Sequence, residues 1–271
     1  MKIREIECKS ALVKSKLPGC DYVINPYVGC QHACVYCYSR FMKRFTGHKE
    51  DWGHFLDAKM NIVDVLKKEL PKAKRELALL SSVTDPYVPA ESKYKLTRRI
   101  LEELLKYQWP VAILTKSALV LRDLDLLKQF KNIDVGLTIT STSDEVTKAF
   151  EPLAAPASAR LAALKKLHAE GINTYCFIGP ILPELTDLEN IFSFASKHAN
   201  EIWCESLNTK GANWFGVEQV LKAKWPKLLP KYKKIFFDKE NHKEYLKTLE
   251  KELLELGKKY KIKVKLFLEH K

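Results

Sequence analysis

Two kinds of segment are missing from this chain of 271 residues. It has no run of about 18 apolar residues, the length at which a helix begins to span a bilayer. Its first residues, Met1 to Glu5, lack the apolar stretch of a secretory signal peptide. We therefore expect a soluble, cytoplasmic protein with no membrane partner. Because the chain also lacks internal repeats, low-complexity segments and linkers, its length fits one large α/β domain over residues 1–271.

Acidic residues are outnumbered by basic ones. The chain has 33 Asp and Glu against 46 Lys and Arg, which leaves a net charge of +13. Such a balance produces a positive field that attracts polyanions, and nucleic acid is therefore a candidate partner. The alternative is an ordinary solvated surface, because Lys247, Lys251 and Lys258 alternate with glutamates near the C-terminus.

The cysteines do not form the two separated C-x2-C pairs of a closed zinc site. Three of the seven, Cys30, Cys34 and Cys37, are spaced C-x3-C-x2-C. Thiolates select iron–sulfur clusters or zinc, and this many free thiols fit a reducing compartment. His32 is available as a fourth zinc ligand, but a tetrahedron so local in sequence would be cramped. Three cysteines can instead hold a 4Fe–4S cluster with one iron left open for chemistry.

This cysteine motif, followed by the aromatic Tyr38, resembles the signature of the radical S-adenosylmethionine (SAM) superfamily. Further segments in the same order narrow the resemblance to the spore photoproduct lyase-like, DNA-repair-type branch. These segments are Asn25-Pro26-Tyr27, Ser82-Val83-Thr84-Asp85-Pro86-Tyr87, Thr115-Lys116-Ser117 with Arg122-Asp123, and Glu151-Pro152 with Arg160.

The resemblance implies an enzyme with two cofactors. Cys30, Cys34 and Cys37 would bind a 4Fe–4S cluster, whose open iron would be chelated by the amino and carboxylate groups of SAM. An electron from a donor such as ferredoxin or flavodoxin would split SAM into methionine and a deoxyadenosyl radical. Nucleic acid is the substrate suggested by the nearest analogues, and a small metabolite or another macromolecule remains open. A non-catalytic zinc-binding nucleic-acid module is the alternative from another class.

Short apolar runs alternate with helical patterns, which predicts a parallel sheet curled into a partial TIM-like barrel of six βα units. The core covers about residues 20–208, and a C-terminal extension follows over 209–271. The expected strands are 22–25, 77–83, 111–115, 135–140, 174–178 and 201–207, and the expected helices are 39–45, 61–70, 97–106, 120–130, 157–170 and 188–198. We expect residues 46–58 to form a surface insertion, Gly171 and Gly257 to end helices, and 261–268 to form a last strand.

In such barrels the loops after the strands carry the chemistry, because all strand ends open on one face. The expected SAM-binding residues there are Tyr38, Thr84, Asp85, Lys116, Thr138 and Thr140. Lys116 suits the SAM carboxylate, and Asp85 suits its amino or ribose groups. Each residue also has a plain structural alternative. Lys116 could be a solvated lysine, and Asp85 could cap a turn. Arg160 could serve only to pair with Glu151.

One departure from the branch concerns hydrogen donation. Spore photoproduct lyase carries a hydrogen-donating cysteine in the motif where this chain has Ser82, and a hydroxyl O–H bond is too strong to replace it readily. Alternation along 201–207 puts Ile202, Cys204 and Ser206 on one face, which we assign to the inside of the barrel. We therefore expect Cys204 to line the cavity as a catalytic thiol. An inert buried cysteine is the alternative.

Overall fold

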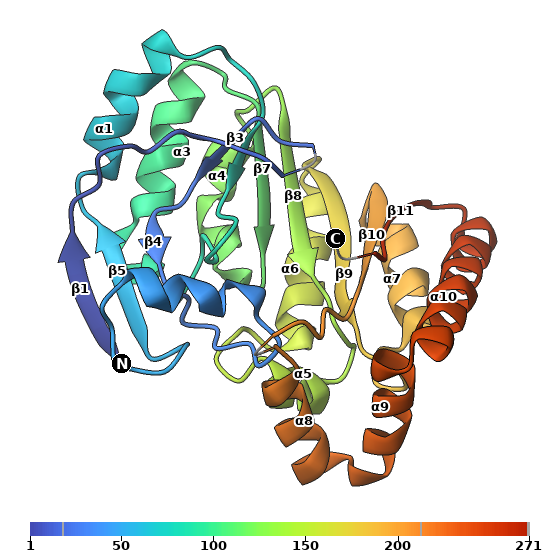
Figure 1. Ribbon diagram of the computed structural model, residues 1–271. Coiled ribbons are helices and arrows are strands. Elements are labelled where there is room, and N and C mark those ends of the chain that lie inside the picture. Colours follow the sequence, from blue (N-terminus) through green and yellow to red (C-terminus); the bar gives the residue numbers. More distant parts are fainter. Residues whose placement is uncertain (18, 212, 270–271) are drawn as a thin grey trace.

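The computed structural model describes residues 1–17, 19–211 and 213–269, and its centre is an eight-stranded sheet (Figure 1). The strands follow the order β11-β10-β9-β8-β7-β6-β3-β2. Every neighbouring pair is parallel except β2 with β3. The bounds are β2 (Val13–Lys14), β3 (Tyr22–Ile24), β6 (Ala78–Leu80), β7 (Val111–Thr115), β8 (Ile133–Thr138), β9 (Asn173–Ile181), β10 (Glu201–Ser206) and β11 (Lys263–Phe267). The six predicted strands are thus present, and the sheet is open between its edges.

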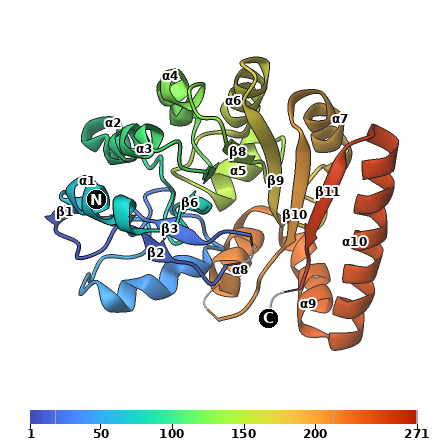
Figure 2. The same cartoon turned by 90° about the horizontal axis from the view of Figure 1, so that it is seen from above.

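Helices cover the outer side of the curved sheet, as the end-on view in Figure 2 shows for α3, α4, α6, α7 and α10. The helices are α1 (Ile62–Glu69), α2 (Glu91–Tyr94), α3 (Leu96–Lys106), α4 (Leu124–Leu127), α5 (Asp144–Phe150), α6 (Ala157–Ala169), α7 (Leu188–His198), α8 (Asn213–Lys224), α9 (Leu229–Phe237) and α10 (Lys239–Tyr260). The short 3-10 helices are η1 (Tyr38–Phe45), η2 (Leu70–Lys72), η3 (Ala118–Asp123) and η4 (Pro226–Leu228). None of the described helices is long and apolar enough to span a membrane.

The two faces of the strands differ as expected from their alternation. In β8 the side chains of Val135 and Leu137 are fully buried in the apolar core, and Thr138 on the other face lines a cavity. Gly136 shares the face of Thr138, and a Cβ there would lie 2.2 Å from the ring of Tyr175 on β9. The inner face of β8 therefore carries Gly136 and Thr138.

The predicted surface insertion at residues 46–58 is wrong. Residues Phe55–Lys59 form the strand β5, which pairs in parallel with β1 (Lys2–Ile6) and antiparallel with β4 (Tyr27–Val28) in a separate three-stranded sheet. The first four residues of β5 are all buried. A strand covered on both faces shows no polar–apolar alternation, so the pattern gave no signal.

Two helix predictions also need correction. Gly257 does not end the C-terminal helix, because α10 continues to Tyr260 and ends where Lys261 takes a φ of 53°. Gly257 instead allows close packing, since a Cβ there would lie 2.6 Å from Val264 Cγ2. The predicted helix 120–130 is divided between η3 and α4. The helices α2, α5, α8 and α9 have no predicted counterpart. Gly171, with a φ of 79°, follows α6 as predicted.

Candidate active site

A cavity of about 310 Å³ opens where the parallel strands end. Its lining brings together residues from every part of the barrel. Of those that the sequence singled out, it includes Cys30, Cys34, Cys37, Tyr38, Thr84, Asp85, Lys116 and Thr138. Their roles remain predictions, but the folded chain places all of them at one site.

The loop that carries the cysteines, residues 29–38 (the cluster loop), is held by two close backbone approaches. A Cβ on Gly53 would lie 2.3 Å from Ala33 Cβ, and a Cβ on Gly216 would lie 2.3 Å from the carbonyl oxygen of Val35. Gly53 precedes β5 and Gly216 belongs to α8, so the misread segment 46–58 and the C-terminal extension both support the loop. Neither contact has a signature in the local sequence.

Asp85 connects three segments of the site through its carboxylate. Oδ1 accepts hydrogen bonds from the Thr115 hydroxyl at 2.6 Å and the Tyr87 amide at 2.8 Å. Oδ2 accepts one from the Lys116 amide at 2.8 Å and lies 3.3 Å from Nδ1 of His32 in the cluster loop. Burial opposes ionisation, but the His32 ring and these hydrogen bonds lower the pKa of Asp85 to about 2. Asp85 is therefore an ionised residue that positions the site, with few lone pairs left for a ligand.

Lys116 has the opposite character, because its backbone is fixed and its side chain is available. Its Nζ lies 5.7 Å from the centre of the Tyr36 ring and has no hydrogen bond or ion pair within the described residues. Burial disfavours the charged form, yet the acidic groups of Cys34 and Glu151 keep the pKa of Lys116 above its ordinary value. A half-buried ammonium that faces a cavity suits an anionic ligand group.

Glu151 and Arg160 form a fully buried ion pair behind the cluster loop. Glu151 also accepts hydrogen bonds from the hydroxyls of Tyr36 and Thr140, the latter at 2.6 Å. This explains the Glu151-Pro152…Arg160 motif, which fixes Tyr36 between two of the cysteines. Thr140 lies beyond the end of β8 and is not among the cavity-lining residues, so its expected place in the cavity is not observed.

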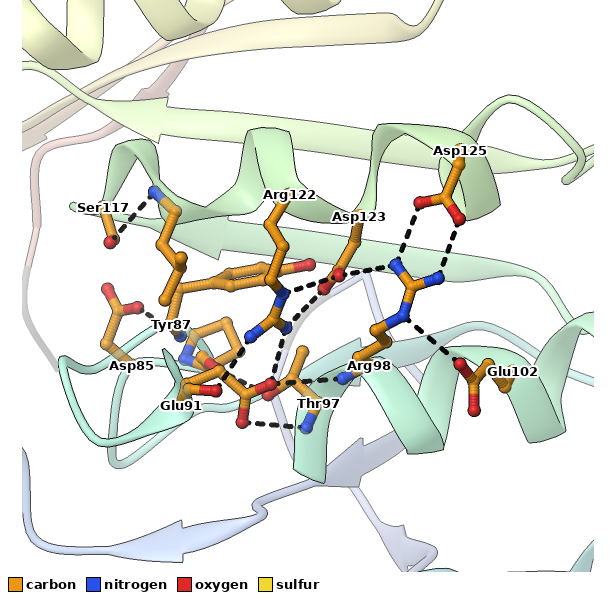
Figure 3. Close-up of polar contacts among 12 residues, drawn as sticks. Asp85, Tyr87, Glu91, Thr97, Arg98, Glu102, Ser117, Arg122, Asp123 and Asp125 are labelled. Carbon is orange, nitrogen blue, oxygen red and sulfur yellow. Dashed lines mark hydrogen bonds and ion pairs between the residues drawn. The ribbon is translucent and has the colours of Figure 1, made fainter. Parts of the chain in front are cut away.

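The Arg122-Asp123 motif supports the loop that follows β6 from behind (Figure 3). Arg122 donates to Glu91 Oε1 at 2.7 Å and to both oxygens of Asp123 at 2.8 Å. The Arg98 side chain joins Asp123 to Asp125 at 3.1 and 2.9 Å. Because Glu91 accepts from the Thr97 amide at 3.0 Å, the network holds the start of α3 and the loop that carries Asp85. The motif positions the site without entering the cavity.

Cys204 does not lie in the cavity as predicted. It is fully buried in the apolar core together with Cys176 and with Ile191 of α7, on the helix-facing side of β10. The assignment of the inner face is thus wrong for Cys204, whereas Ser206, predicted on the same face, does line the cavity, because the pairing of β10 with β9 shifts between these two residues. Trp203, on the opposite face, stacks on Tyr175 with ring centroids 4.3 Å apart.

Glu205 is the functional candidate that the sequence did not reveal. It lines the cavity from β10, and its carboxylate has no hydrogen bond or ion pair in the described parts of the chain. Burial raises the pKa of Glu205 to about 7, although the charge of Lys116 opposes this. A correct assignment of the inner face of β10 would have identified it.

The donor set at the cavity fits an iron–sulfur cluster better than a zinc ion. All seven cysteines are free, and the three of the motif face one cavity. His32, the candidate fourth zinc ligand, is 2% exposed, with Nδ1 turned to Asp85. Within the described residues no three His, Cys, Asp or Glu side chains converge as the ligands of a single ion would. Thiol ligands with a nearby free ammonium fit a cluster that binds SAM.

The sequence model of the radical SAM superfamily matches residues 24–195, more than half of the chain. The chain belongs to this superfamily. The match extends from β3 into α7. A member of this superfamily is expected to bind its cluster through the three-cysteine motif, which here lies in the cluster loop.

Three similar proteins place this radical SAM enzyme among its relatives. An uncharacterized protein of Methanocaldococcus jannaschii is 42% identical over 215 residues, which are 79% of this chain and 81% of that protein. The radical SAM Nalpha-GlyT isomerase of Pseudomonas phage M6 is 22% identical over 195 residues, or 70% of this chain and 40% of the isomerase. The structure of spore photoproduct lyase complexed with dinucleoside spore photoproduct superposes with a TM-score of 0.69, at 17% identity, over 98% of this chain and 82% of that one. This last likeness shows the shared fold.

Proposed function

We propose that this radical SAM enzyme binds a 4Fe–4S cluster through Cys30, Cys34 and Cys37, cleaves SAM reductively and acts on nucleic acid. The observation that carries the proposal is that these three thiols and the unpaired ammonium of Lys116 line one cavity. When bound, the cluster supplies the electron that splits SAM into methionine and a deoxyadenosyl radical. That electron would come from a small donor protein such as ferredoxin or flavodoxin.

The residues of the chain have distinct tasks in this proposal. Lys116 pairs with the SAM carboxylate, and Asp85 holds the backbone amide of Lys116 in place. Thr84 donates to the carbonyl oxygen of Gly29 and so fixes the start of the cluster loop as well as a wall of the cavity. Apolar side chains such as Leu114 and Phe177 line the cavity and limit the access of water to a reactive radical.

Two observations support nucleic acid as the substrate class. The net charge of +13 favours a polyanion. The structural neighbour, spore photoproduct lyase, was solved with a dinucleoside photoproduct. Because Ser82 replaces the cysteine of that enzyme and Cys204 is buried away from the cavity, we propose a reaction that does not use either position as a thiol hydrogen donor.

The proposal is tested by anaerobic reconstitution with iron and sulfide, followed by measurement of bound iron and of deoxyadenosine formed with dithionite. The protein is expected to be brown and to release deoxyadenosine from SAM. Cys30→Ala, Cys34→Ala and Cys37→Ala should each abolish both, and Cys20→Ala, a half-buried cysteine outside the cavity, should retain both. A colourless protein with one bound zinc ion would overturn the proposal.

A further inference from the structure

The 3-10 helix η1 begins directly after Cys37, the last cysteine of the motif, and exposes aromatic rings to solvent. Phe41 is 44% exposed and Phe45 is 66% exposed. The guanidinium carbon of the exposed Arg44 lies 4.6 Å from the ring centre of Phe45 and 5.6 Å from that of Phe41. We call Phe41, Arg44 and Phe45 the basic–aromatic strip. Contiguous exposed apolar surface marks an interaction site, whereas a single exposed apolar side chain is ordinary.

The strip continues from the wall of the cavity. Side chains three residues apart align along a 3-10 helix, so Tyr38, Phe41 and Arg44 form one row. Tyr38 and Ser39 line the cavity, and the Tyr38 hydroxyl donates to the carbonyl oxygen of Ser82 on the opposite rim. Met42 packs against the apolar core and so holds η1 in this orientation. A ligand too large for the cavity would therefore extend onto the strip.

The basic charge of residues 38–49 favours an anionic ligand. Residues 38–49 contain four Lys and Arg, namely Arg40, Lys43, Arg44 and Lys49, and no Asp or Glu. Arg44 has no ion pair within the described residues, and Lys43 reaches the exposed Asp51 only at 3.9 Å. An uncompensated guanidinium between two exposed rings provides a phosphate contact beside stacking surfaces. Proteins that bind single-stranded nucleic acid combine these same elements.

We propose that the basic–aromatic strip binds the unpaired nucleotides that flank the nucleotide entering the cavity. Bases stack on Phe41 and Phe45, and Arg44 contacts a phosphate. The ligand is single-stranded or locally unpaired, because a base inside a duplex offers neither a free face for stacking nor access to a concave site. This inference rests on the proposed nucleic-acid substrate and specifies how that substrate is held.

The test measures binding of fluorescein-labelled, mixed-sequence single-stranded DNA and RNA oligonucleotides by fluorescence anisotropy, with reconstituted protein at low salt. Phe41→Ala and Phe45→Ala should each weaken binding at least about fivefold, because stacking on one ring contributes that much or more. Arg44→Ala should weaken binding and reduce the slope of log affinity against log salt by roughly 0.7. Phe45→Trp should retain the affinity of the unchanged protein. Duplexes of the same sequence should bind more weakly than the single strands.

Matched controls separate the strip from general surface effects. Phe237→Ala removes a ring that is 58% exposed on α9, and Arg99→Ala removes an exposed arginine on α3; both should keep the affinity for oligonucleotides. Iron content and dithionite-driven SAM cleavage are measured in every variant and should match the unchanged protein. If the unchanged protein bound no iron and cleaved no SAM, the proposed function would be refuted. The anisotropy result would still decide whether the strip binds oligonucleotides.

Two results would overturn the inference. One is an equal affinity for oligonucleotides in the Phe41→Ala, Phe45→Ala and unchanged proteins. The other is a loss of SAM cleavage in the strip variants only when flavodoxin replaces dithionite, with oligonucleotide binding intact. That second result would make the strip a docking site for an acidic electron donor.

Discussion

The carboxylate of Asp85 accepts a hydrogen bond of 2.8 Å from the backbone amide of Lys116. The bond joins the loop after β6 to the end of β7, and the same carboxylate approaches His32 of the cluster loop at 3.3 Å. The buried carboxylate of Asp85 thus fixes the backbone of Lys116 relative to the cluster loop, and in the part of the chain that the structure describes the lysine side chain itself makes no hydrogen bond or ion pair that does so.

Lys116→Ala is expected to weaken SAM binding about tenfold or more, because a charge-assisted hydrogen bond contributes about 1.5–3 kcal/mol. Equilibrium dialysis with labelled SAM on reconstituted protein measures the effect. Lys128→Ala is the control, since Lys128 is on the surface and pairs with Glu170 at 2.7 Å. Unchanged SAM affinity in Lys116→Ala would remove Lys116 from the binding site.

Asp85→Asn is expected to lower the free energy of unfolding by about 1–3 kcal/mol, because an amide cannot accept all the hydrogen bonds that the buried carboxylate accepts. SAM binding should weaken with it as Lys116 shifts. Denaturant titration and dialysis give the two values. Asp125→Asn, which alters only an exposed ion pair with Arg98, should cost less than about 1 kcal/mol. Similar losses in both variants would contradict the positioning role of Asp85.

Gly216→Ala is expected to displace the cluster loop, because the added methyl carbon would lie 2.3 Å from the Val35 carbonyl oxygen. Bound iron per chain should fall, and the melting temperature of the apoprotein should fall with it. Gln219→Ala on the exposed side of the same helix should change stability by less than about 0.5 kcal/mol. Normal iron incorporation in Gly216→Ala would show that α8 does not support the loop.

Glu205→Gln tests the carboxyl group inside the cavity through its pH dependence. Burial raises the pKa of Glu205 from 4.5 to about 7, so between these values the unfolded chain is ionised and the folded chain is not. Stability contributed by the neutral acid is therefore present below about pH 4.5 and lost as the pH rises to about 7. The melting temperature of Glu205→Gln relative to the unchanged protein should rise over this interval and then level off. Glu145→Gln, at an exposed position, should show no such trend, and a pH-independent difference for Glu205→Gln would refute the raised pKa.

The local pattern of the sequence was sufficient to indicate the radical SAM superfamily and to predict most of the parallel sheet. Cysteine spacing is a local property, so Cys30, Cys34 and Cys37 could be recognised before any fold was known. The alternation of apolar runs with helical periods likewise predicted the parallel strands, because each βα unit buries its own apolar faces. The buried pair Glu151–Arg160 was also considered from the sequence, and the structure contains it.

Only the tertiary structure decided which face of β10 lines the cavity. Alternation separates Cys204 from Glu205 but does not say which of them faces inward. The choice depends on neighbours distant in sequence, since Trp203 stacks on Tyr175 inside the sheet while Cys204 packs with α7 outside it. The contact of Gly216 with the cluster loop has the same origin, because two segments separated by most of the chain meet only after folding. The sequence by itself therefore determined the cysteine motif that we propose as the cluster ligand set, and long-range packing determined which side chains surround it.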